Sequence, residues 1–365
     1  IDYIRTPIAK FQGGLSEVRA DDLAAIVLKE IVKRNPQIPA EEIEDVILGC
    51  ANQAGEDNRN VARMASLLAE LPIKIGGETV NRLCASGMAA IANAYRAIAI
   101  GEGDFYIAGG VEQMTRAPYV LSKSAQPFGR DVQLFDSSFG WRFVNPKMKE
   151  LYGVDGMGET AENIAEIYKI SREAQDEFAL HSQQKATSAQ NSGRLAQEIV
   201  KVEIPQKKGE PKIFSEDEFV KPDTTLDKLA KLRPAFKKEG GSVTAGNSSG
   251  LNDGAAAMIL ASEDAVKKYN LKPLAKIISS AVVGVEPRIM GIGPVEATKK
   301  ALSRANLSLE DMDIIELNEA FAAQALSVLQ ELGIDAKDER LNPNGGAIAL
   351  GHPLGMSGTR IVGTA

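Results

Sequence analysis

Apolar residues recur along the chain with two different periods, and each period predicts a kind of element. Residues 22–32, 59–71 and 85–100 carry apolar side chains at helical spacing. Residues 45–49 and 105–110 are short and almost continuously apolar, which is typical of strands buried on both faces. Strands that alternate with helices in this way predict an α/β fold with a parallel or mixed sheet covered on both sides.

The expected helices carry conventional boundary residues. Asp21 or Asp22 is expected to cap the first helix, and Gly101 to end the third, since glycine accepts the left-handed conformation that follows a last turn. Arg96 is the only charged residue between positions 85 and 100. A helix that is apolar on nearly every side is expected to be buried.

The chain becomes more polar near Pro118 and regains its α/β rhythm only from about residue 242. Within the polar region, residues 159–168 and 171–191 predict helices, with Thr160 or Ser171 as caps. This polar region is interpreted as an insertion that carries loops.

After the insertion, residues 255–260, 274–285 and 313–317 predict strands, and a helix is expected from Pro294 to Ala305. We therefore divide the chain into a first half at 1–117 that is completed by about 251–271, an inserted loop domain at 118–250, and a second half at 272–365.

An internal repeat relates the two halves at a single ungapped offset. Cys84 and His352 are 268 positions apart, and so are Asp45 and Asp313. Identical pairs at this offset include Asp45/Asp313, Ile47/Ile315, Ala54/Ala322, Gly77/Gly345, Gly87/Gly355 and Met88/Met356. We interpret them as a duplicated α/β unit that places Cys84 and His352 at related helix starts.

Composition narrows the class of protein. The 365 residues suffice for roughly two domains of about 150 residues. Hydrophobic residues make up 44% and charged residues 25%, as in ordinary globular enzymes, and no apolar run approaches the ~18 residues of a membrane span. The net charge of −7 gives a nucleic-acid partner no general support.

Two cysteines in so long a chain fit a reducing compartment, and we expect a cytoplasmic location. The chain opens on Ile1 rather than Met, so an organellar targeting segment stays open as an alternative.

One segment has a positive net charge, unlike the chain as a whole. Residues 201–238 hold ten Lys and Arg against seven Asp and Glu, a local charge of +3 that leaves −10 for the rest. Such a segment is either a solvated lysine-rich face or a binding site for a phosphate-bearing ligand. Its charge alone favours the solvated face.

Candidate chemistry centres on Cys84, which stands where an irregular segment enters a helix. The helix dipole and free N–H groups would lower the pKa of a thiol there, and a nearby histidine would generate the nucleophilic thiolate. The alternative is a buried structural cysteine, which is common. Cys50 ends a predicted buried strand and has no histidine near it in the sequence, so it is interpreted as structural.

The chain has only two histidines. His352 lies among glycines, which indicates close backbone placement near a ligand, whereas His181 lies within a predicted helix. Asn318 follows a predicted strand, where its amide either caps the next helix or holds a water or an oxyanion.

Several motifs together resemble those of the thiolase family over nearly the whole chain. They are Asn81-Arg82-Leu83-Cys84-Ala85-Ser86-Gly87, Asn318-Glu319-Ala320-Phe321, Asn342-Pro343-Asn344-Gly345-Gly346 and Gly351-His352-Pro353, with Arg5-Thr6-Pro7-Ile8 and Thr244-Ala245-Gly246-Asn247 in support. Residues 140–146 and 159–163 resemble most the 3-oxoadipyl-CoA thiolases of aromatic-acid breakdown.

The resemblance implies a five-layered αβαβα fold of two similar halves with an inserted loop domain that binds CoA. It implies that Cys84 attacks a 3-oxoacyl-CoA, releases acetyl-CoA and holds an acyl thioester that a second CoA accepts. His352 would activate Cys84 and help to bind the thioester oxygen, with Asn318 anchoring a water. Ser249 would line the pantetheine tunnel, and Lys221 and Lys228 would contact the CoA phosphates.

The resemblance implies CoA as a co-substrate, no permanently bound cofactor and no metal site. It also implies a homodimer or homotetramer, without a nucleic-acid or membrane partner. Thiolases use a second cysteine, in a Cys-x-Gly motif beyond Gly-His-Pro, and this chain ends at Ala365 before such a motif. We expect the natural chain to continue.

Four alternatives remain open from the sequence. The first is a condensing ketoacyl synthase, which would need a second histidine that only His181 could supply. The others are a general 3-ketoacyl-CoA thiolase of fatty-acid β-oxidation, an acetyl-CoA acetyltransferase, and a CoA-binding protein without activity. The absence of a histidine beside Gly156-Met157-Gly158 disfavours a dedicated acetoacetyl-CoA enzyme.

A dicarboxylate substrate would need a cation for its distal carboxylate. Residues 141–149 offer Arg142, Lys147 and Lys149 beside Trp141 and Phe143, and Arg142 is the preferred candidate because guanidinium binds carboxylate bidentately. An ion pair between Arg142 and a nearby acid at a subunit contact is the equally weighted alternative.

Overall fold

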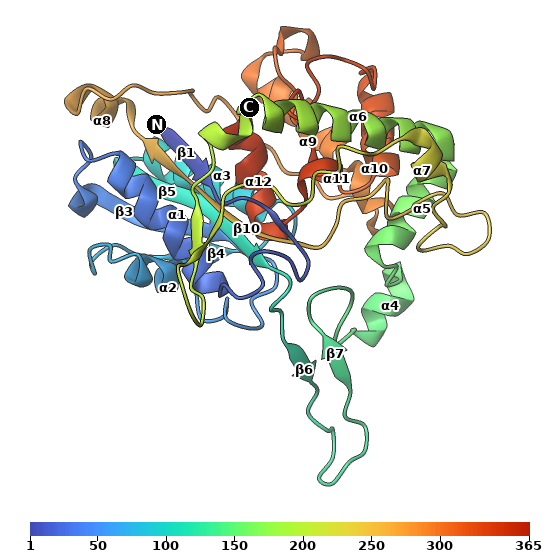
Figure 1. Cartoon of the computed structure of the whole chain (residues 1–365). Coiled ribbons are helices and arrows are strands. Elements are labelled where there is room, and N and C mark those ends of the chain that lie inside the picture. Colours follow the sequence, from blue (N-terminus) through green and yellow to red (C-terminus); the bar gives the residue numbers. More distant parts are fainter.

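The computed structural model describes residues 1–365, and its centre is one six-stranded mixed sheet (Figure 1). The strand order is β1-β10-β5-β3-β4, with β2 paired to β10. β3 runs parallel to β4 and β5, whereas β10 is antiparallel to β5, β1 and β2. The strands are β1 (Asp2–Arg5), β2 (Ala9–Lys10), β3 (Ile43–Gly49), β4 (Glu78–Val80), β5 (Phe105–Gln113) and β10 (Asn252–Ala261).

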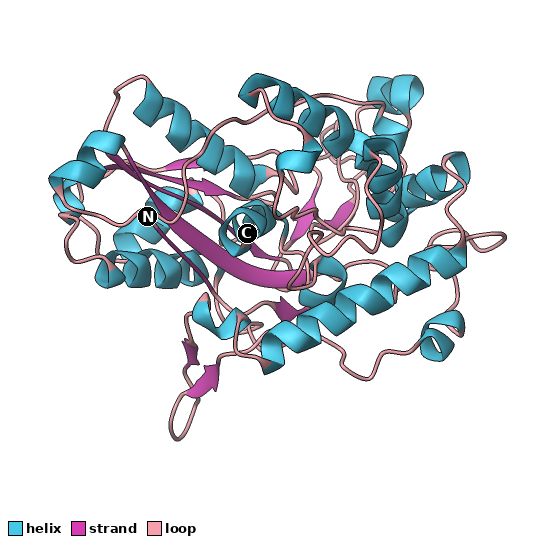
Figure 2. Ribbon diagram, turned by 90° about the horizontal axis from the view of Figure 1, so that it is seen from above, coloured by secondary structure: helices cyan, strands magenta, loops and turns pink.

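Helices cover both faces of this sheet, as Figure 2 shows from above. Val46, Leu48 and alternate residues of β5 and β10 face one hydrophobic cluster, which they share with α1 (Ala20–Arg34) and α2 (Val61–Leu68). Ile47 and the intervening residues face a second cluster, which contains α3 (Ser86–Ala99) and Met356 of α12 (Leu354–Thr364). The strands are apolar throughout because both of their faces are buried.

Most expected helices form near their predicted bounds, but two predicted caps are wrong. α1 begins after Arg19, so Asp21 and Asp22 lie in its first turn, where their charges favour the helix dipole. Ser171 caps α6 (Arg172–Asn191) by accepting a hydrogen bond from the Ala174 N–H, whereas Thr160 lies inside α5 (Met157–Ile167). Gly101 follows α3 with a φ of 81°, as expected of a helix stop.

The region between β5 and β10 is built from short elements around two longer helices. A hairpin of two short strands projects far from the body (Figure 1). The elements are β6 (Tyr119–Leu121), β7 (Leu134–Asp136), α4 (Pro146–Tyr152), α5, α6, η2 (Leu195–Gln197), β8 (Val202–Ile204), β9 (Lys212–Phe214) and α7 (Leu226–Ala230). α6 runs across one side of the molecule and packs against α7, α10 and α11.

The remaining helices lie mostly after β10. They are α8 (Glu263–Lys268), η3 (Pro287–Ile292), α9 (Gly293–Ala305), η4 (Leu309–Asp311), α10 (Ala322–Leu332), α11 (Ala347–Leu350) and α12, with η1 (Ala40–Glu42) near the start of the chain. No helix combines the length and the apolar character that crossing a membrane requires.

Two predicted strands of the second half are wrong. Residues 274–285 form no strand, and residues 313–317 make only one isolated bridge, between Ile315 and Leu341. Both segments are apolar enough for a strand, but neither has a neighbouring strand to take its backbone hydrogen bonds.

The internal repeat has a direct structural counterpart. α3 and α12 begin at equivalent positions of the repeat and pack against each other. A Cβ atom on Gly87 would lie 2.8 Å from the Gly355 carbonyl oxygen, and one on Gly358 would lie 2.3 Å from the Met88 nitrogen. Glycines at these positions let the two helix starts approach backbone to backbone.

Candidate active site

Cys84 lies in a strained turn two positions before the first residue of α3. Leu83 directly before it has a φ of 48°, which a leucine rarely adopts. The Asn81 side chain accepts a hydrogen bond from the Leu83 N–H at 2.9 Å, and the Ser86 hydroxyl donates to the Leu83 carbonyl at 2.6 Å. These bonds hold the turn in its strained form, as is usual near functional groups.

The protonation state of Cys84 differs from the expectation. Desolvation raises the pKa of the Cys84 thiol to about 11, and the negative charge of Glu112 adds to the rise. The prediction that the helix start lowers this pKa is therefore wrong in the resting protein, because desolvation outweighs the dipole. Cys84 rests as a neutral thiol, so its reaction as a nucleophile requires a base.

His352 has the protonation state of such a base. Its ring is buried, and desolvation together with the charge of Arg360 lowers its pKa to about 4. The Ser357 hydroxyl donates to the Pro353 carbonyl at 2.8 Å and lies 2.6 Å from His352 Nδ1, so Nδ1 carries the proton and donates to Ser357. Nε2 is left as the unprotonated, proton-accepting nitrogen.

Asn318 meets this nitrogen directly. Its Nδ2 lies 3.3 Å from His352 Nε2, while its Oδ1 is buried without a hydrogen-bond partner. The role of Asn318 as a helix cap is excluded, since α10 begins only at Ala322 and has no side-chain cap. A buried amide oxygen without a partner is a site where a water could bind.

Two buried side chains hold the Asn318 segment in place. Asn342 accepts a hydrogen bond from the Leu317 N–H at 2.8 Å and donates to Glu319 at 2.8 Å. Glu319 also accepts from Ser182 at 2.6 Å, and a Cβ on Gly346 would lie 2.1 Å from its carboxyl carbon. The motif glycine is therefore required by the packing of the motif glutamate.

The helix pair brings the cysteine and histidine segments side by side. His352 lies two positions before the first residue of α12, as Cys84 does before α3. Because the two helix starts touch at Gly87 and Gly355, residues that are distant in sequence meet at one place.

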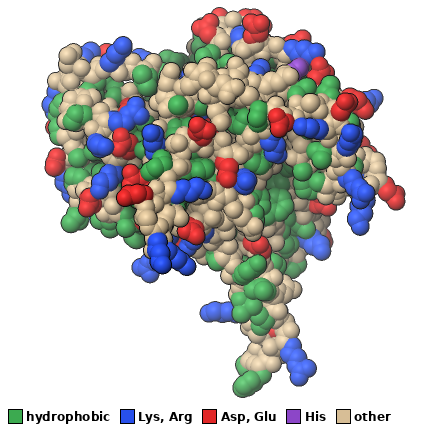
Figure 3. Space-filling model, in the orientation of Figure 1, with side chains coloured by type: hydrophobic (Ala, Val, Ile, Leu, Met, Phe, Trp, Pro, Cys, Tyr) green, Lys and Arg blue, Asp and Glu red, His purple; other side chains and the backbone are tan.

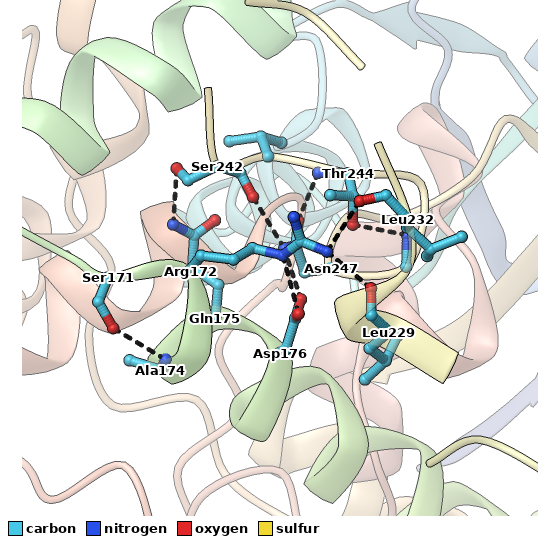
Figure 4. Close-up of polar contacts among 12 residues, drawn as sticks. Ser171, Arg172, Ala174, Gln175, Asp176, Leu229, Leu232, Ser242, Thr244 and Asn247 are labelled. Atoms are coloured by element: carbon cyan, nitrogen blue, oxygen red, sulfur yellow. Dashed lines mark hydrogen bonds and ion pairs between the residues drawn. The ribbon is translucent and has the colours of Figure 1, made fainter. Parts of the chain in front are cut away.

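Figure 4 shows how residues 242–247, which precede Ser249 in the same loop, are held. Asn247 donates to Asp176 of α6 at 2.9 Å, and Gln175 donates to the Ser242 hydroxyl at 2.9 Å. Ser249 itself donates from its backbone and its hydroxyl to the Ala320 carbonyl, at 3.0 and 3.1 Å. The structure therefore places Ser249 beside the Asn318 segment.

The same network holds the helix that carries Lys228. Arg172 donates to Asp176 at 2.8 Å and to the carbonyls of Leu229 and Leu232 at 2.6 and 3.1 Å (Figure 4). The Leu229 carbonyl lies in the last turn of α7, and the Leu232 carbonyl lies just beyond the end of this helix. One arginine thus connects α6, α7 and the Ser249 loop.

Lys221 and Lys228 are exposed and form no ion pair. Lys221 Nζ lies 4.6 Å from the centre of the Phe219 ring, and desolvation lowers its pKa. Lys228 Nζ donates to the Asp223 carbonyl at 2.6 Å. By contrast, Lys237 nearby is neutralised by Glu166 at 3.0 Å. The two candidate lysines keep charges that an anion could use.

Other candidate residues lie apart from this site. His181 is partly exposed on α6 and makes no side-chain hydrogen bond. The Cys50 thiol is buried, donates to Asp57 at 3.5 Å and has a pKa raised well above its ordinary value by desolvation, which fits its structural interpretation. Lys147 and Lys149 are exposed on α4.

Arg142 makes no ion pair within this chain, and the alternative of an ion pair at a subunit contact stays a prediction. Its guanidinium donates to the Asn52 side chain at 2.9 Å and to the Ser137 carbonyl at 3.4 Å. No acid of this chain neutralises its charge.

The sequence motifs missed several residues that hold the site. Asn252 accepts a hydrogen bond from the His352 N–H at 2.9 Å, Ser357 fixes the imidazole tautomer, and Glu112 receives an amide of α12. Ser357 lies one turn after the histidine and could have been suspected. Asn252 and Glu112 are too distant in sequence to give such a signal.

Comparisons with known proteins agree with this arrangement. Residues 1–264 match the thiolase N-terminal domain and residues 271–365 the thiolase C-terminal domain. A 3-oxoadipyl-CoA/3-oxo-5,6-dehydrosuberyl-CoA thiolase of Escherichia coli is 60% identical over 99% of this chain and 90% of its own length. A beta-ketoadipyl-CoA thiolase of Pseudomonas knackmussii is 60% identical over 100% of this chain and 90% of its own length.

More distant relatives carry other names. A probable acetyl-CoA acyltransferase of Staphylococcus epidermidis is 49% identical over 98% of this chain and 88% of its own length. The crystal structure of the Bacillus anthracis acetyl-CoA acetyltransferase superposes with a TM-score of 0.91 at 43% identity, covering 99% of this chain and 89% of that one.

Proposed function

Because the chain belongs to the thiolase family, we propose that it cleaves 3-oxoadipyl-CoA with CoA to acetyl-CoA and succinyl-CoA. The substrate rests on identity, which is near 60% over the full chain to relatives named for 3-oxoadipyl-CoA or beta-ketoadipyl-CoA. Relatives named acyltransferase or acetyltransferase are 49% and 43% identical.

We propose Cys84 as the nucleophile and His352 as its base. The thiol proton passes to Nε2 of His352 while Cys84 Sγ bonds to the 3-oxo carbon. The bond between carbons 2 and 3 then breaks, acetyl-CoA leaves as an enolate, and succinyl remains as a thioester on Cys84. The proton that His352 accepted balances the protonation of this enolate, so His352 is neutral again. The thiol of a second CoA then attacks the thioester, the bond between Cys84 Sγ and the succinyl carbon breaks, succinyl-CoA leaves, and the proton of the CoA thiol restores the Cys84 thiol.

The observation that carries this assignment is the contact between Asn318 and the bare Nε2 of His352. A buried, neutral imidazole can accept the thiol proton, whereas an imidazolium could not. Asn318 would orient the ring and hold a water that donates to the developing oxyanion.

CoA binding is proposed for the surface around α7. Lys221 and Lys228 would meet its phosphates, and Ser249 would line the path of the pantetheine to the Asn318 segment. CoA then enters as a co-substrate, and no residue role here calls for a metal or a resident cofactor.

We also propose a homo-oligomer, either a dimer or a tetramer. The projecting β6–β7 hairpin exposes Tyr119, Leu121, Phe128 and Leu134, and Figure 3 shows hydrophobic side chains along its length. Exposed apolar clusters of this kind usually face another protein surface. Light scattering after gel filtration tests the proposal, and a monomeric mass at micromolar concentration would refute it.

The decisive test of the catalytic proposal is brief incubation with acetyl-CoA followed by peptide mass spectrometry. This half-reaction transfers acetyl to the thiol and requires no carbon–carbon cleavage. We expect an acetyl adduct on Cys84 that disappears in Cys84→Ser. CoA binding without an adduct would leave only the non-enzymatic alternative, and an adduct on Cys50 would overturn the assignment of the nucleophile.

A further inference from the structure

Glu112 is a buried carboxylate on β5 whose hydrogen bonds extend toward both candidate catalytic segments. It is 2% exposed and has no cationic partner. Instead it accepts hydrogen bonds from three backbone N–H groups, those of Ala51, Asn52 and Gly355, at 3.0, 3.1 and 2.8 Å. A buried carboxylate is costly unless such donors satisfy it, so its presence indicates a defined task.

One of these bonds fixes the histidine segment. Gly355 lies in the first turn of α12, three positions after His352, and its N–H points at Glu112. A negative charge at a helix start is favourable because the first N–H groups lack helical partners. The backbone here is packed tightly, since a Cβ on Gly355 would lie 2.5 Å from the Val111 carbonyl oxygen and 2.6 Å from that of Gly49.

The other two bonds fix the cysteine segment through a short relay. The Ala51 carbonyl accepts a hydrogen bond from the Asn81 side chain at 2.9 Å, and Asn81 in turn accepts from the Leu83 N–H at 2.9 Å. Leu83, with its positive φ, is the strained residue of the turn directly before Cys84. An unbroken series of hydrogen bonds thus runs from the start of α12 through Glu112 to the residue before Cys84.

We propose that Glu112 is a positioning residue that holds the Cys84 turn and the His352 segment in register for proton transfer. This inference rests on the proposed roles of Cys84 and His352. Glu112 acts through the two backbone segments that it joins and is not assigned a contact with the substrate. The two segments belong to the two parts of the repeat, so the sheet strand β5 supplies the element that aligns them (Figure 1).

A metal site is the competing interpretation of the same residue. Ligand atoms of Cys50, Asp57 and Glu112 lie within 4.8 Å of one another. However, both Glu112 oxygens already accept N–H groups, and Asp57 accepts those of Gln53 and Gly55 at 3.0 and 2.8 Å. Protein N–H groups therefore already bind these carboxylate oxygens, and only Glu112 also reaches α12, which favours a positioning role for Glu112 over a metal site.

The test measures the rate of Cys84 acetylation by acetyl-CoA in Glu112→Gln, which keeps the size of the side chain but not its charge. Desolvation raises the pKa of Glu112 to about 7, so the rates are compared at about pH 8.5, where the wild-type carboxylate is ionised. Misplacement of the base should slow acetylation about 10- to 100-fold. The acetyl-CoA concentration for half-maximal rate should stay within about two-fold, since the α7 surface is untouched. Glu112 also raises the thiol pKa by its charge, so a purely electrostatic role predicts faster acetylation in this variant.

Asp57→Asn is the matched control. Asp57 is an equally buried carboxylate that caps N–H groups of the same loop but makes no bond to α12. The Asp57→Asn variant should have a lowered melting temperature, as Glu112→Gln does. Its Cys84 should nevertheless be acetylated at close to the wild-type rate. Asn81→Ala breaks the series of hydrogen bonds at another point and should also slow acetylation. This variant replaces Glu112→Gln as the test if Glu112→Gln fails to fold.

Acetylation of folded Glu112→Gln at or above the wild-type rate would overturn the proposal, as would a wild-type rate in Asn81→Ala. Equal slowing in Asp57→Asn would also overturn it, because the effect would then be general loop damage. A wild-type protein that forms no Cys84 adduct would instead refute the proposed function itself.

Discussion

The side-chain nitrogen of Asn318 lies 3.3 Å from Nε2 of His352, and the asparagine oxygen beside it has no partner. The amide donor satisfies the imidazole nitrogen that we propose as the acceptor of the thiol proton. Its unpaired oxygen is oriented by the Asn342 and Glu319 contacts that hold the neighbouring backbone.

Replacing Asn318 with Ala should therefore impair catalysis more than binding. Loss of a preorganised oxyanion contact costs about 10²- to 10³-fold in rate. We expect a fall of that size in the rate of Cys84 acetylation, with little change in half-saturating acetyl-CoA. Gln324→Ala, on the buried face of α10, is a control for disturbance of this region. A wild-type acetylation rate in Asn318→Ala would remove Asn318 from the site.

The pKa values predict an unusual pH dependence of acetylation. The pKa of His352 is lowered to about 4, so the base stays competent above that pH and is lost only as pH falls through it. The Cys84 pKa of about 11 means that free thiolate forms only at high pH. Desolvation raises the pKa of Glu112 to about 7, so the comparison starts at roughly pH 8, where this carboxylate is ionised. From there to about pH 10 the rate should change less than about three-fold in wild type.

His352→Ala provides the comparison for that profile. Without the base, reaction must wait for free thiolate, so the rate should be lower and rise about tenfold per pH unit over the same range. Rapid-quench mass spectrometry at several pH values measures both proteins. A wild-type rate that also rises tenfold per unit would contradict proton transfer to His352.

The close packing of the start of α12 against β3 and β5 predicts a strict requirement for glycine at position 355. A Cβ there would lie 2.5 Å from the Val111 carbonyl oxygen, a backbone atom that cannot move aside easily. Gly355→Ala should destabilise the fold by about 1–3 kcal/mol and displace α12. Denaturant unfolding measures the change, and Gly284→Ala, where nothing lies within 4 Å, should be nearly neutral.

The uncompensated lysines predict salt-sensitive CoA binding. Replacing Lys221 and Lys228 together with Ala should raise KM for CoA about tenfold at low salt, and less at high salt where phosphate attraction is screened. Lys207→Ala with Lys208→Ala removes the same charge from an exposed part of the same segment. If both double variants raise KM equally, the effect reflects general charge and not a site around α7.

Arg142 remains the candidate for recognition of the distal carboxylate. Its guanidinium is held by Asn52 and Ser137 but is not neutralised, so it is free to bind an acid. Arg142→Ala should lower kcat/KM for 3-oxoadipyl-CoA at least about tenfold while sparing an uncharged 3-oxoacyl-CoA of similar length. Lys149→Ala, an exposed cation on α4, is the control.

Two results would distinguish the role of Arg142 from the identity of the substrate. A preference for 3-oxoadipyl-CoA that survives Arg142→Ala would keep the substrate and reject this residue. A wild-type preference for the uncharged substrate would leave a general 3-oxoacyl-CoA thiolase.

The sequence by itself determined most of the local elements and which residues are candidates for the chemistry. The period of apolar residues predicted α1, β3 and β5 because strands buried on both faces must be apolar at every position. It also predicted that Cys84 and His352 start equivalent segments, since their neighbouring glycines repeat at one offset. The motifs identified Asn318 as their companion.

Only the tertiary structure decided the pKa values of these residues and the hydrogen bonds that connect their segments. The pKa of Cys84 is raised and not lowered, because desolvation depends on everything packed around the thiol and not on its position before a helix. Likewise, residues 274–285 have the composition of a strand but form none, since a strand exists only where a partner takes its hydrogen bonds. Glu112 carries no motif, and its bonds to Ala51 and Gly355 exist because folding brings together segments that no local pattern connects.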